Sequence, residues 1–358
     1  MKLFIFAGEP SGDLHGEKLL KALPGVNAVG VGGPKMRAAG LNCICPMENF
    51  QVMGFVDVIL RLPQILFHFY KIRSFILKEN PEVCVFIDYP GFNLRMERSL
   101  RKKGYKGKLV HYICPSVWAH GKGRIQVMEE NLDLLLSILP FEKELFDPSK
   151  LKVEYVGHPL VQRIKEYPYK PFSLPKNTVA LFPGSRKKEI ERNLPLYLKV
   201  LKQFPELPIA ISVSNPRYLP LMPKNAILVP ADYTYELMNE ATFAIAKSGT
   251  VTLELGLHKT PTIVTYAISY IDTLAAKYIF RLNLKYYCLV NILLNKEVFP
   301  ELMGPAFTEQ ALTSAIKTLN HQKCIEECKT LISLLGPKDA SSTAAVFILN
   351  LQGDRQNR

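Results

Sequence analysis

Short apolar runs alternate with longer helical patterns along most of this sequence, and that alternation is its strongest constraint on fold. Runs this short suit buried strands better than helices, and strands separated by helices form βαβ units with a mostly parallel sheet. In the first half, the pattern predicts strands at 3–7, 83–87, 109–113, 134–139 and 153–156, with helices at 14–23 and about 92–103.

A second series follows, with strands predicted at 178–182, 209–213, 227–229, 243–246 and 262–265 and a helix at 189–203. Between the two series, residues 163–177 contain three prolines and no periodicity, which is typical of a linker. The length of 358 residues also fits two domains. We therefore predict an α/β protein with domains at 1–165 and 178–335 and a linker at 166–177. In the segment 336–358, a helix over about 340–351 would pack on the first domain or on a partner subunit.

Composition narrows the function classes. The formal net charge is +13, from 45 Lys and Arg against 32 Asp and Glu, and it is spread over both halves. This favours a body that handles anions or approaches an anionic membrane over a nucleic-acid-binding arm. Seven cysteines, none of them in a CxxC pair, indicate reduced thiols in a cytoplasmic protein without a zinc site. No apolar run is long enough to span a membrane.

Two loops of the first half follow predicted strands and carry candidate site residues. The loop 8–13, Gly-Glu-Pro-Ser-Gly-Asp, opens a helix and could face an anion, or Ser11 or Asp13 could simply cap that helix. It is neither a P-loop nor a GxGxxG dinucleotide fingerprint. Asp88 ends the strand 83–87. A partly buried carboxyl there would have a raised pKa and be a candidate general base, while capping of the next turn is the plainer alternative.

Two loops of the second half are suited to phosphate. In 183–186, Pro-Gly-Ser-Arg, main-chain amides, a helix start and Arg186 together suit a diphosphate, although the basic residues could be a solvated helix start. In 248–254, Thr250 and the turn amides could hold phosphate, and Glu254 lies one helical turn further on. Glu254 could accept hydrogen bonds from a ribose, or be a surface residue of a capped helix. The chain has no Asp-x-Asp, which argues against a metal-bridged diphosphate and leaves this task to amides and Arg186.

The region 55–69 is apolar beyond one helical face and is interleaved with basic residues. Such a stripe is either part of the core or a membrane contact. The apolar residues that would contact a membrane are Val56, Val58, Ile59, Leu62, Ile65 and Leu66.

These loops together resemble the lipid-A-disaccharide synthase family. The resemblance runs in family order over nearly the whole chain, so it is far more specific than any one motif. It is carried by 8–13, 32–36, 52–54, 87–88, 115–119, 139–142, 156–159, 183–186, 248–250, Glu254, Asn291 and 300–302.

The resemblance implies a GT-B fold, in which two Rossmann-like domains have parallel sheets facing an interdomain cleft. It implies an inverting glycosyl transfer with no metal and no cofactor. The donor would be UDP-2,3-diacylglucosamine and the acceptor 2,3-diacylglucosamine 1-phosphate (lipid X). The products would be a β(1→6)-linked disaccharide 1-phosphate and UDP. This is a step of lipid A biosynthesis in Gram-negative bacteria, so we expect a homodimer that is peripheral on the cytoplasmic face of the inner membrane.

The resemblance also assigns roles by position. Asp88 would be the base that deprotonates the acceptor 6-hydroxyl, and Arg186 would neutralise charge on the departing UDP. The donor would be bound by Gly184, Ser185, Arg186, Ser248, Gly249, Thr250, Glu254 and Asn291. The acceptor side would be lined by Glu9, Ser11, Gly12, Asp13 and Trp118.

The sequence departs from the family pattern at a few positions. Gly91 stands where many members have an acidic residue, so a second carboxylate is not expected beside Asp88. Cys114, His120 and Val290 replace a serine, a tryptophan and a proline that are usual there.

Two other functions share these features. Another GT-B enzyme, such as a UDP-sugar epimerase, would keep the UDP-binding second half but differ at 8–13 and 115–119. A non-catalytic nucleotide-sugar sensor at the membrane would not need Asp88. An RNA-binding role is disfavoured because aromatic residues do not interleave with a basic stripe.

Overall fold

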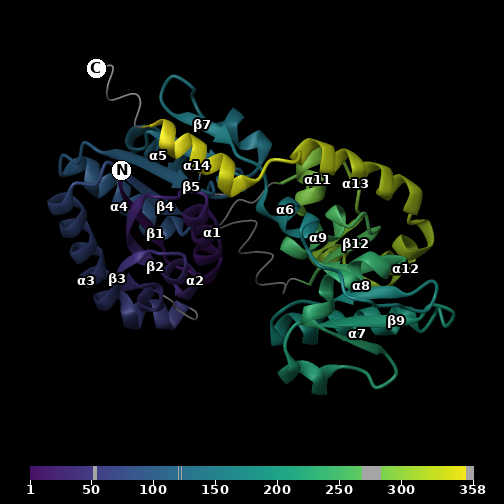
Figure 1. Cartoon of the computed structure of the whole chain (residues 1–358). Coiled ribbons are helices and arrows are strands. Elements are labelled where there is room, and N and C mark those ends of the chain that lie inside the picture. Colours follow the sequence, from purple (N-terminus) through teal and green to yellow (C-terminus); the bar gives the residue numbers. More distant parts are fainter. Residues whose placement is uncertain (51–54, 120, 122, 268–283, 352–358) are drawn as a thin grey trace. The chain divides into compact units, whose positions relative to one another are not determined.

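The computed structural model describes residues 1–50, 55–119, 121, 123–267 and 284–351, with the backbone alone at 55–60. Contacts within it divide the chain into two units, Met1–Gln162 with Pro337–Arg358, and Arg163–Gly336. Residues 166–177, predicted as a linker, therefore belong by their contacts to the second unit. Figure 1 shows the elements of each unit.

The first unit is built on a parallel sheet with the strand order β3-β2-β1-β4-β5-β6-β7. The central strands are almost wholly buried, as expected when helices cover both faces of a parallel sheet. The strands are β1 (Lys2–Ala7), β2 (Asn27–Gly32), β3 (Asn42–Pro46), β4 (Val83–Ile87), β5 (Lys108–Tyr112), β6 (Leu134–Ser137) and β7 (Lys152–Tyr155). The helices are α1 (Pro10–Lys21), α2 (Pro34–Ala38), α3 (Phe55–Glu79), α4 (Pro90–Lys102), α5 (Gly123–Asn131) and α6 (Pro159–Lys165), which crosses the unit boundary.

The second unit repeats this architecture with the strand order β10-β9-β8-β11-β12-β13, again parallel throughout. Its strands are β8 (Val179–Phe182), β9 (Ile209–Val213), β10 (Ile227–Pro230), β11 (Phe243–Lys247), β12 (Thr262–Tyr266) and β13 (Glu301–Met303). Its helices are α7 (Lys187–Leu201), α8 (Thr234–Glu240), α9 (Thr250–Leu257), α11 (Leu289–Leu294), α12 (Glu309–Thr318) and α13 (His321–Leu335). The predicted α/β class with two parallel sheets is confirmed.

The strands β2, β3 and β13 were not predicted. The close approach of β2 to β1 has a visible cause, because a Cβ added at Gly30 would lie 1.9 Å from the carbonyl oxygen of Ile5. Glycine is the residue that permits such contact, and its presence weakens the strand pattern in the sequence.

The last helix, α14 (Ala340–Asn350), returns to the first unit (Figure 1). Ala344 and Ile348 are fully buried in one core cluster with Leu19 and Leu20 of α1. Val346, on the opposite side of the helix, is 56% exposed. The helix therefore completes the hydrophobic core on one face of the first sheet.

We expect Ile348→Ala to destabilise the first unit by about 2–5 kcal/mol, because it leaves a cavity in that core. The control Val346→Ala should change stability by less than about 0.5 kcal/mol. The chain's single tryptophan, Trp118, lies in the first unit, so its fluorescence during urea unfolding reports on that unit. Equal effects of the two substitutions would show that α14 does not contribute to this core.

Candidate functional site

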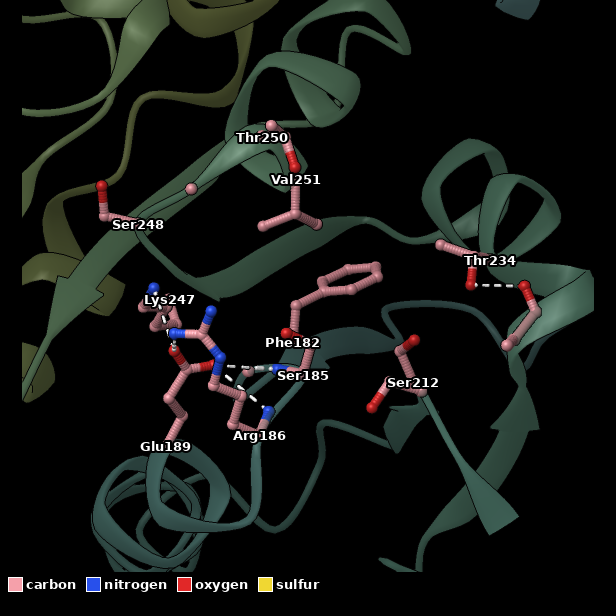
Figure 2. A pocket seen from close by; sticks show the side chains of 14 residues that line it. Phe182, Ser185, Arg186, Glu189, Ser212, Thr234, Lys247, Ser248, Thr250 and Val251 are labelled. Atoms are coloured by element: carbon pink, nitrogen blue, oxygen red, sulfur yellow. Dashed lines mark hydrogen bonds and ion pairs between the residues drawn. The ribbon is translucent and has the colours of Figure 1, made fainter. Parts of the chain in front are cut away.

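A pocket of about 360 Å³ opens in the second unit beside the carboxyl ends of β8, β9 and β11 (Figure 2). Its wall contains the loop 184–186 after β8 and the loop 248–251 after β11. Six of the eight residues assigned to the donor by position line this one pocket: Gly184, Ser185, Arg186, Ser248, Gly249 and Thr250. Two loops far apart in sequence thus meet at one edge of a parallel sheet, which is where such sheets bind ligands.

The first of these loops needs glycine at position 184. Its φ is +130°, and an added Cβ would lie 2.5 Å from the Cβ of Glu189 and 2.7 Å from its Oε2. Glu189 folds back from α7, and its Oε2 accepts hydrogen bonds from the main-chain N–H of Ser185 at 3.0 Å and of Arg186 at 3.3 Å. Glu189 is the third residue of α7, and its carboxylate caps the start of the helix as the glutamate of a capping box does.

Side chains that were not assigned by position also line the pocket, and Glu189, Lys247 and Thr234 are among them. Glu189 Oε1 lies 3.4 Å from Lys247 Nζ and 3.8 Å from Arg186 Nη1. Burial tends to raise the pKa of Glu189, but Lys247 and the two amides outweigh it, so the pKa lies below its ordinary value. The neighbouring positive charge was visible in the sequence as Lys247 directly before the 248–250 turn.

Glu254 is half-buried on α9. Its Oε1 accepts a hydrogen bond from Tyr235 Oη at 2.9 Å. Burial raises its pKa, while Tyr235 and Arg163 act in the opposite direction. Glu254 is not among the residues that line the pocket. Its contact with a ribose therefore stays a prediction.

Asn291 is fully buried, and its side chain is used within the fold. Its Nδ2 donates to the carbonyl of Phe299 at 2.8 Å and to Glu301 Oε1 at 2.9 Å. Its Oδ1 accepts from the N–H groups of Val298 and Phe299. An amide offers two donors and two acceptor sites, so none is left for a ligand in this arrangement. Asn291 thus clamps the segment before β13 in this structure, and its contact with the donor stays a prediction.

In the first unit, Asp88 follows β4 and adopts a left-handed backbone. Asp88 and Tyr89 both have φ near +47°, a conformation that costs a residue with a side chain of order 1–3 kcal/mol. Their surroundings hold it: Asp88 N–H donates to Tyr112 O at 2.8 Å, and Asn93 Nδ2 donates to Asp88 O at 2.6 Å. Strain of this kind is typical of functional sites.

A second carboxylate does lie beside Asp88, contrary to the expectation drawn from Gly91. Burial first, and then the charge and hydrogen bonding of Glu9, raise the pKa of Asp88 to about 6. Glu9 follows β1, which pairs with β4 at Ala7 and Ile87, so the sheet register brings the two loops together. Ser11 Oγ donates to Glu9 Oε1 at 2.8 Å. The second carboxylate thus comes from a different loop.

Sequence reasoning also missed a buried pair behind Asp88. His111 Nδ1 lies 2.7 Å from Glu97 Oε1, and both side chains are almost completely buried. The electrostatic effect of His111 partly offsets the rise in the pKa of Asp88. A histidine within the apolar run of β5 was the signal that could have indicated this pair.

Asp13 serves as a structural cap in this structure, and its contact with the acceptor stays a prediction. It is 3% exposed and accepts hydrogen bonds from the N–H groups of Gly33, Lys35 and Met36 at 2.8–3.0 Å. Its carboxylate therefore caps α2, not the helix on which it lies. Gly12 is also buried, and an added Cβ there would contact Ala7. Of the 8–13 loop, Glu9 lies beside Asp88, and Ser11 donates a hydrogen bond to Glu9.

Trp118 lies in the loop after β5, half-buried, with its ring packed edge-on against Phe141 at 5.9 Å between centroids. Glu142 lies under this loop and accepts hydrogen bonds from Ser137 Oγ and Leu139 N. Burial raises the pKa of Glu142 to about 7. A contact between Trp118 and an acceptor stays a prediction.

The exposed face of α3 carries Leu62, Leu66 and Phe67, which are 47%, 45% and 64% exposed. Ile65 is half-buried and packs on the first core. The side chains of Val56, Val58 and Ile59 lie outside the described residues. Over the described part of the chain, no helix is long and apolar enough to cross a membrane. Within the same residues, no three His, Cys, Asp or Glu side chains are grouped to hold a metal ion.

The family model for lipid-A-disaccharide synthetase matches residues 3–341. A lipid-A-disaccharide synthase of Chlamydia trachomatis serovar D is 41% identical over 350 residues, which cover 91% of this chain and 58% of that protein. The chain thus spans less than two thirds of that relative's length. The enzyme of the same name from Idiomarina loihiensis is 34% identical over 347 residues, which cover 90% of this chain and 90% of that protein.

Solved structures resemble the fold at low identity. The putative UDP-N-acetylglucosamine 2-epimerase of Listeria monocytogenes has a TM-score of 0.64 at 11% identity. The match covers 99% of this chain and 97% of the epimerase. The calicheamicin glycosyltransferase CalG4 has a TM-score of 0.57 at 14% identity, covering 98% of each. These likenesses show that the architecture is that of GT-B glycosyltransferases and epimerases. With the family match over nearly its whole length, the chain belongs to the lipid-A-disaccharide synthetase family.

Proposed function

We propose that this protein transfers a 2,3-diacylglucosamine unit from UDP to 2,3-diacylglucosamine 1-phosphate (lipid X). The products are a β(1→6)-linked disaccharide 1-phosphate and UDP, with inversion at the anomeric carbon. Family membership supports the reaction class. The observation that carries the chemistry is Asp88, a half-buried carboxyl with a raised pKa beside Glu9.

Asp88 is suited to act as the base. With a pKa of about 6 it is about 90% ionised at pH 7, yet it binds a proton far more readily than an ordinary aspartate. We propose that it takes the proton of the acceptor 6-hydroxyl as that oxygen attacks the anomeric carbon. Glu9 and Ser11 would line the acceptor side, and Trp118 would contact the acceptor as well.

The donor diphosphate would lie in the pocket of the second unit. The amides of 184–186 and 248–250 and the guanidinium of Arg186 would stabilise charge on the departing UDP. Glu254 would hold the ribose. Because the main-chain amides and the permanently charged guanidinium of Arg186 would stabilise the diphosphate, the proposed transfer needs no metal.

The first test is to incubate the purified protein with UDP-2,3-diacylglucosamine and lipid X in detergent with excess EDTA. Mass spectrometry should show the disaccharide 1-phosphate despite the chelator. Asp88→Asn should lower turnover by about 100-fold or more while leaving UDP affinity nearly unchanged, because only proton transfer is lost.

Release of UDP without disaccharide would favour a hydrolase or an epimerase-like reaction and contradict the proposal. Full turnover by Asp88→Asn would remove Asp88 as the base.

The two carboxylates predict a shift in the pH dependence. Glu9→Gln removes a negative charge that raises the pKa of Asp88, so that pKa should fall. The acidic limb of kcat/KM, expected near pH 6 in the wild type, should therefore move to lower pH. Glu17→Gln, a change at a half-buried glutamate of α1 that pairs with Lys21, serves as the control and should leave the limb in place. If the acidic limb of kcat/KM did not move in Glu9→Gln, the proposed effect of Glu9 on the pKa of Asp88 would be contradicted.

Both substrates carry acyl chains, so we propose that the exposed face of α3 contacts an anionic membrane, on the cytoplasmic face of the inner membrane. Leu62, Leu66 and Phe67 supply the apolar surface, and exposed Arg61 and Lys71 flank it. The protein would act there as a homodimer, and analytical ultracentrifugation tests that state.

Phe67→Glu should reduce co-flotation with vesicles that contain anionic lipid by at least about threefold, since a charge replaces an inserted apolar ring. Val346→Glu, a matched change at another exposed apolar residue, should float like the wild type. Equal flotation of both variants would show that α3 is not the contact.

A further inference from the structure

We propose that Lys247 binds the donor diphosphate and that Glu189 holds its ammonium group in place until the diphosphate arrives. This inference rests on the proposed function, because it assigns a residue and an exchange of ion pairs to the same donor pocket. Neither residue was among those assigned by position.

Lys247 is fixed at the pocket by its strand. It is the last residue of β11, in register with Thr265 of β12, and it directly precedes the 248–250 loop. Its side chain is only 20% exposed and lines the pocket, and its Nζ lies 4.8 Å from the ring centroid of Tyr266. A cation in this half-buried position is screened by water much less than Arg186, whose side chain is 84% exposed.

The carboxylate of Glu189 already contacts the groups that would bind an anionic ligand (Figure 2). Its carboxylate faces the Ser185 and Arg186 amides, the Arg186 guanidinium and the Lys247 ammonium. Its lowered pKa shows that these groups stabilise the negative charge. An arriving diphosphate would offer more negative charge to the same donors.

The charges explain why Lys247 is needed. Glu189 offsets one of the two cations, so Arg186 and Lys247 together leave the pocket wall with one net positive charge. Without Lys247, Glu189 would cancel Arg186, and the residues that line the pocket would carry no net positive charge to meet the diphosphate. When Lys247 turns from Glu189 to the diphosphate, the amides of Ser185 and Arg186 can turn from Glu189 to the same ligand. The diphosphate then caps α7 in place of Glu189.

A purely structural role is the alternative, in which Lys247 only neutralises a helix-capping glutamate. The two accounts differ in ligand selectivity. A diphosphate-binding lysine affects UDP and leaves uridine unaffected, whereas loss of structure would weaken both or lower the melting temperature.

We would measure binding of UDP and of uridine by calorimetry to the full chain at low salt. Lys247→Met should weaken UDP binding at least about tenfold, or about 1.4 kcal/mol, with uridine affinity unchanged. Lys187→Met is the control, because Lys187 is an exposed lysine on the same loop–helix segment, paired with Glu191 and absent from the pocket wall. It should bind UDP like the wild type.

Glu189→Gln tests the second half of the proposal. Glutamine keeps an oxygen for the two amides but removes the charge. UDP binding should tighten by about threefold or more, with uridine unaffected.

Unchanged UDP affinity in Lys247→Met would overturn the role of Lys247, and weaker UDP binding in Glu189→Gln would overturn the role of Glu189. If the wild type bound no UDP at all, the proposal that this pocket binds the donor would be contradicted. The roles proposed for Lys247 and Glu189 would then be contradicted as well.

Discussion

In both units, the loops that carry the proposed chemistry follow the carboxyl ends of parallel strands. Parallel pairing points every such loop to the same edge of its sheet, so residues far apart in sequence become neighbours. In the first unit, pairing of β1 with β4 brings Glu9 to Asp88. In the second, β8 and β11 pair side by side and bring 184–186 to 248–250. The register of the strands thus determines which polar groups can act together.

This arrangement depends on polar residues that serve the fold itself. Asp13 satisfies three N–H groups at the start of α2, and Asn291 uses all of its hydrogen-bonding capacity on the segment 298–301. Buried polar groups without partners are costly, so such residues are as constrained as any ligand contact. A motif residue therefore has two possible tasks, to hold the loop or to touch the substrate. Only the direction of its side chain distinguishes them.

The sequence predicted the α/β class and most central strands because buried parallel strands are continuous apolar runs, as in β4. It missed β2, β3 and β13; β2 contains two glycines, and β13 is only three residues long. The loops 183–186 and 248–250 could be predicted from motif and position. The contacts of Glu189 with Lys247, Glu9 with Asp88 and His111 with Glu97 could not. They depend on strand register and helix packing, which no local pattern encodes.

We propose that UDP binds to the second unit through these two loops. A crystal structure of the protein with UDP tests it most directly. We expect the diphosphate to be bound by the main-chain amides of 184–186 and 248–250, with the Arg186 guanidinium beside it. A diphosphate bound elsewhere, for example beside the 8–13 loop of the first unit, would contradict this binding mode.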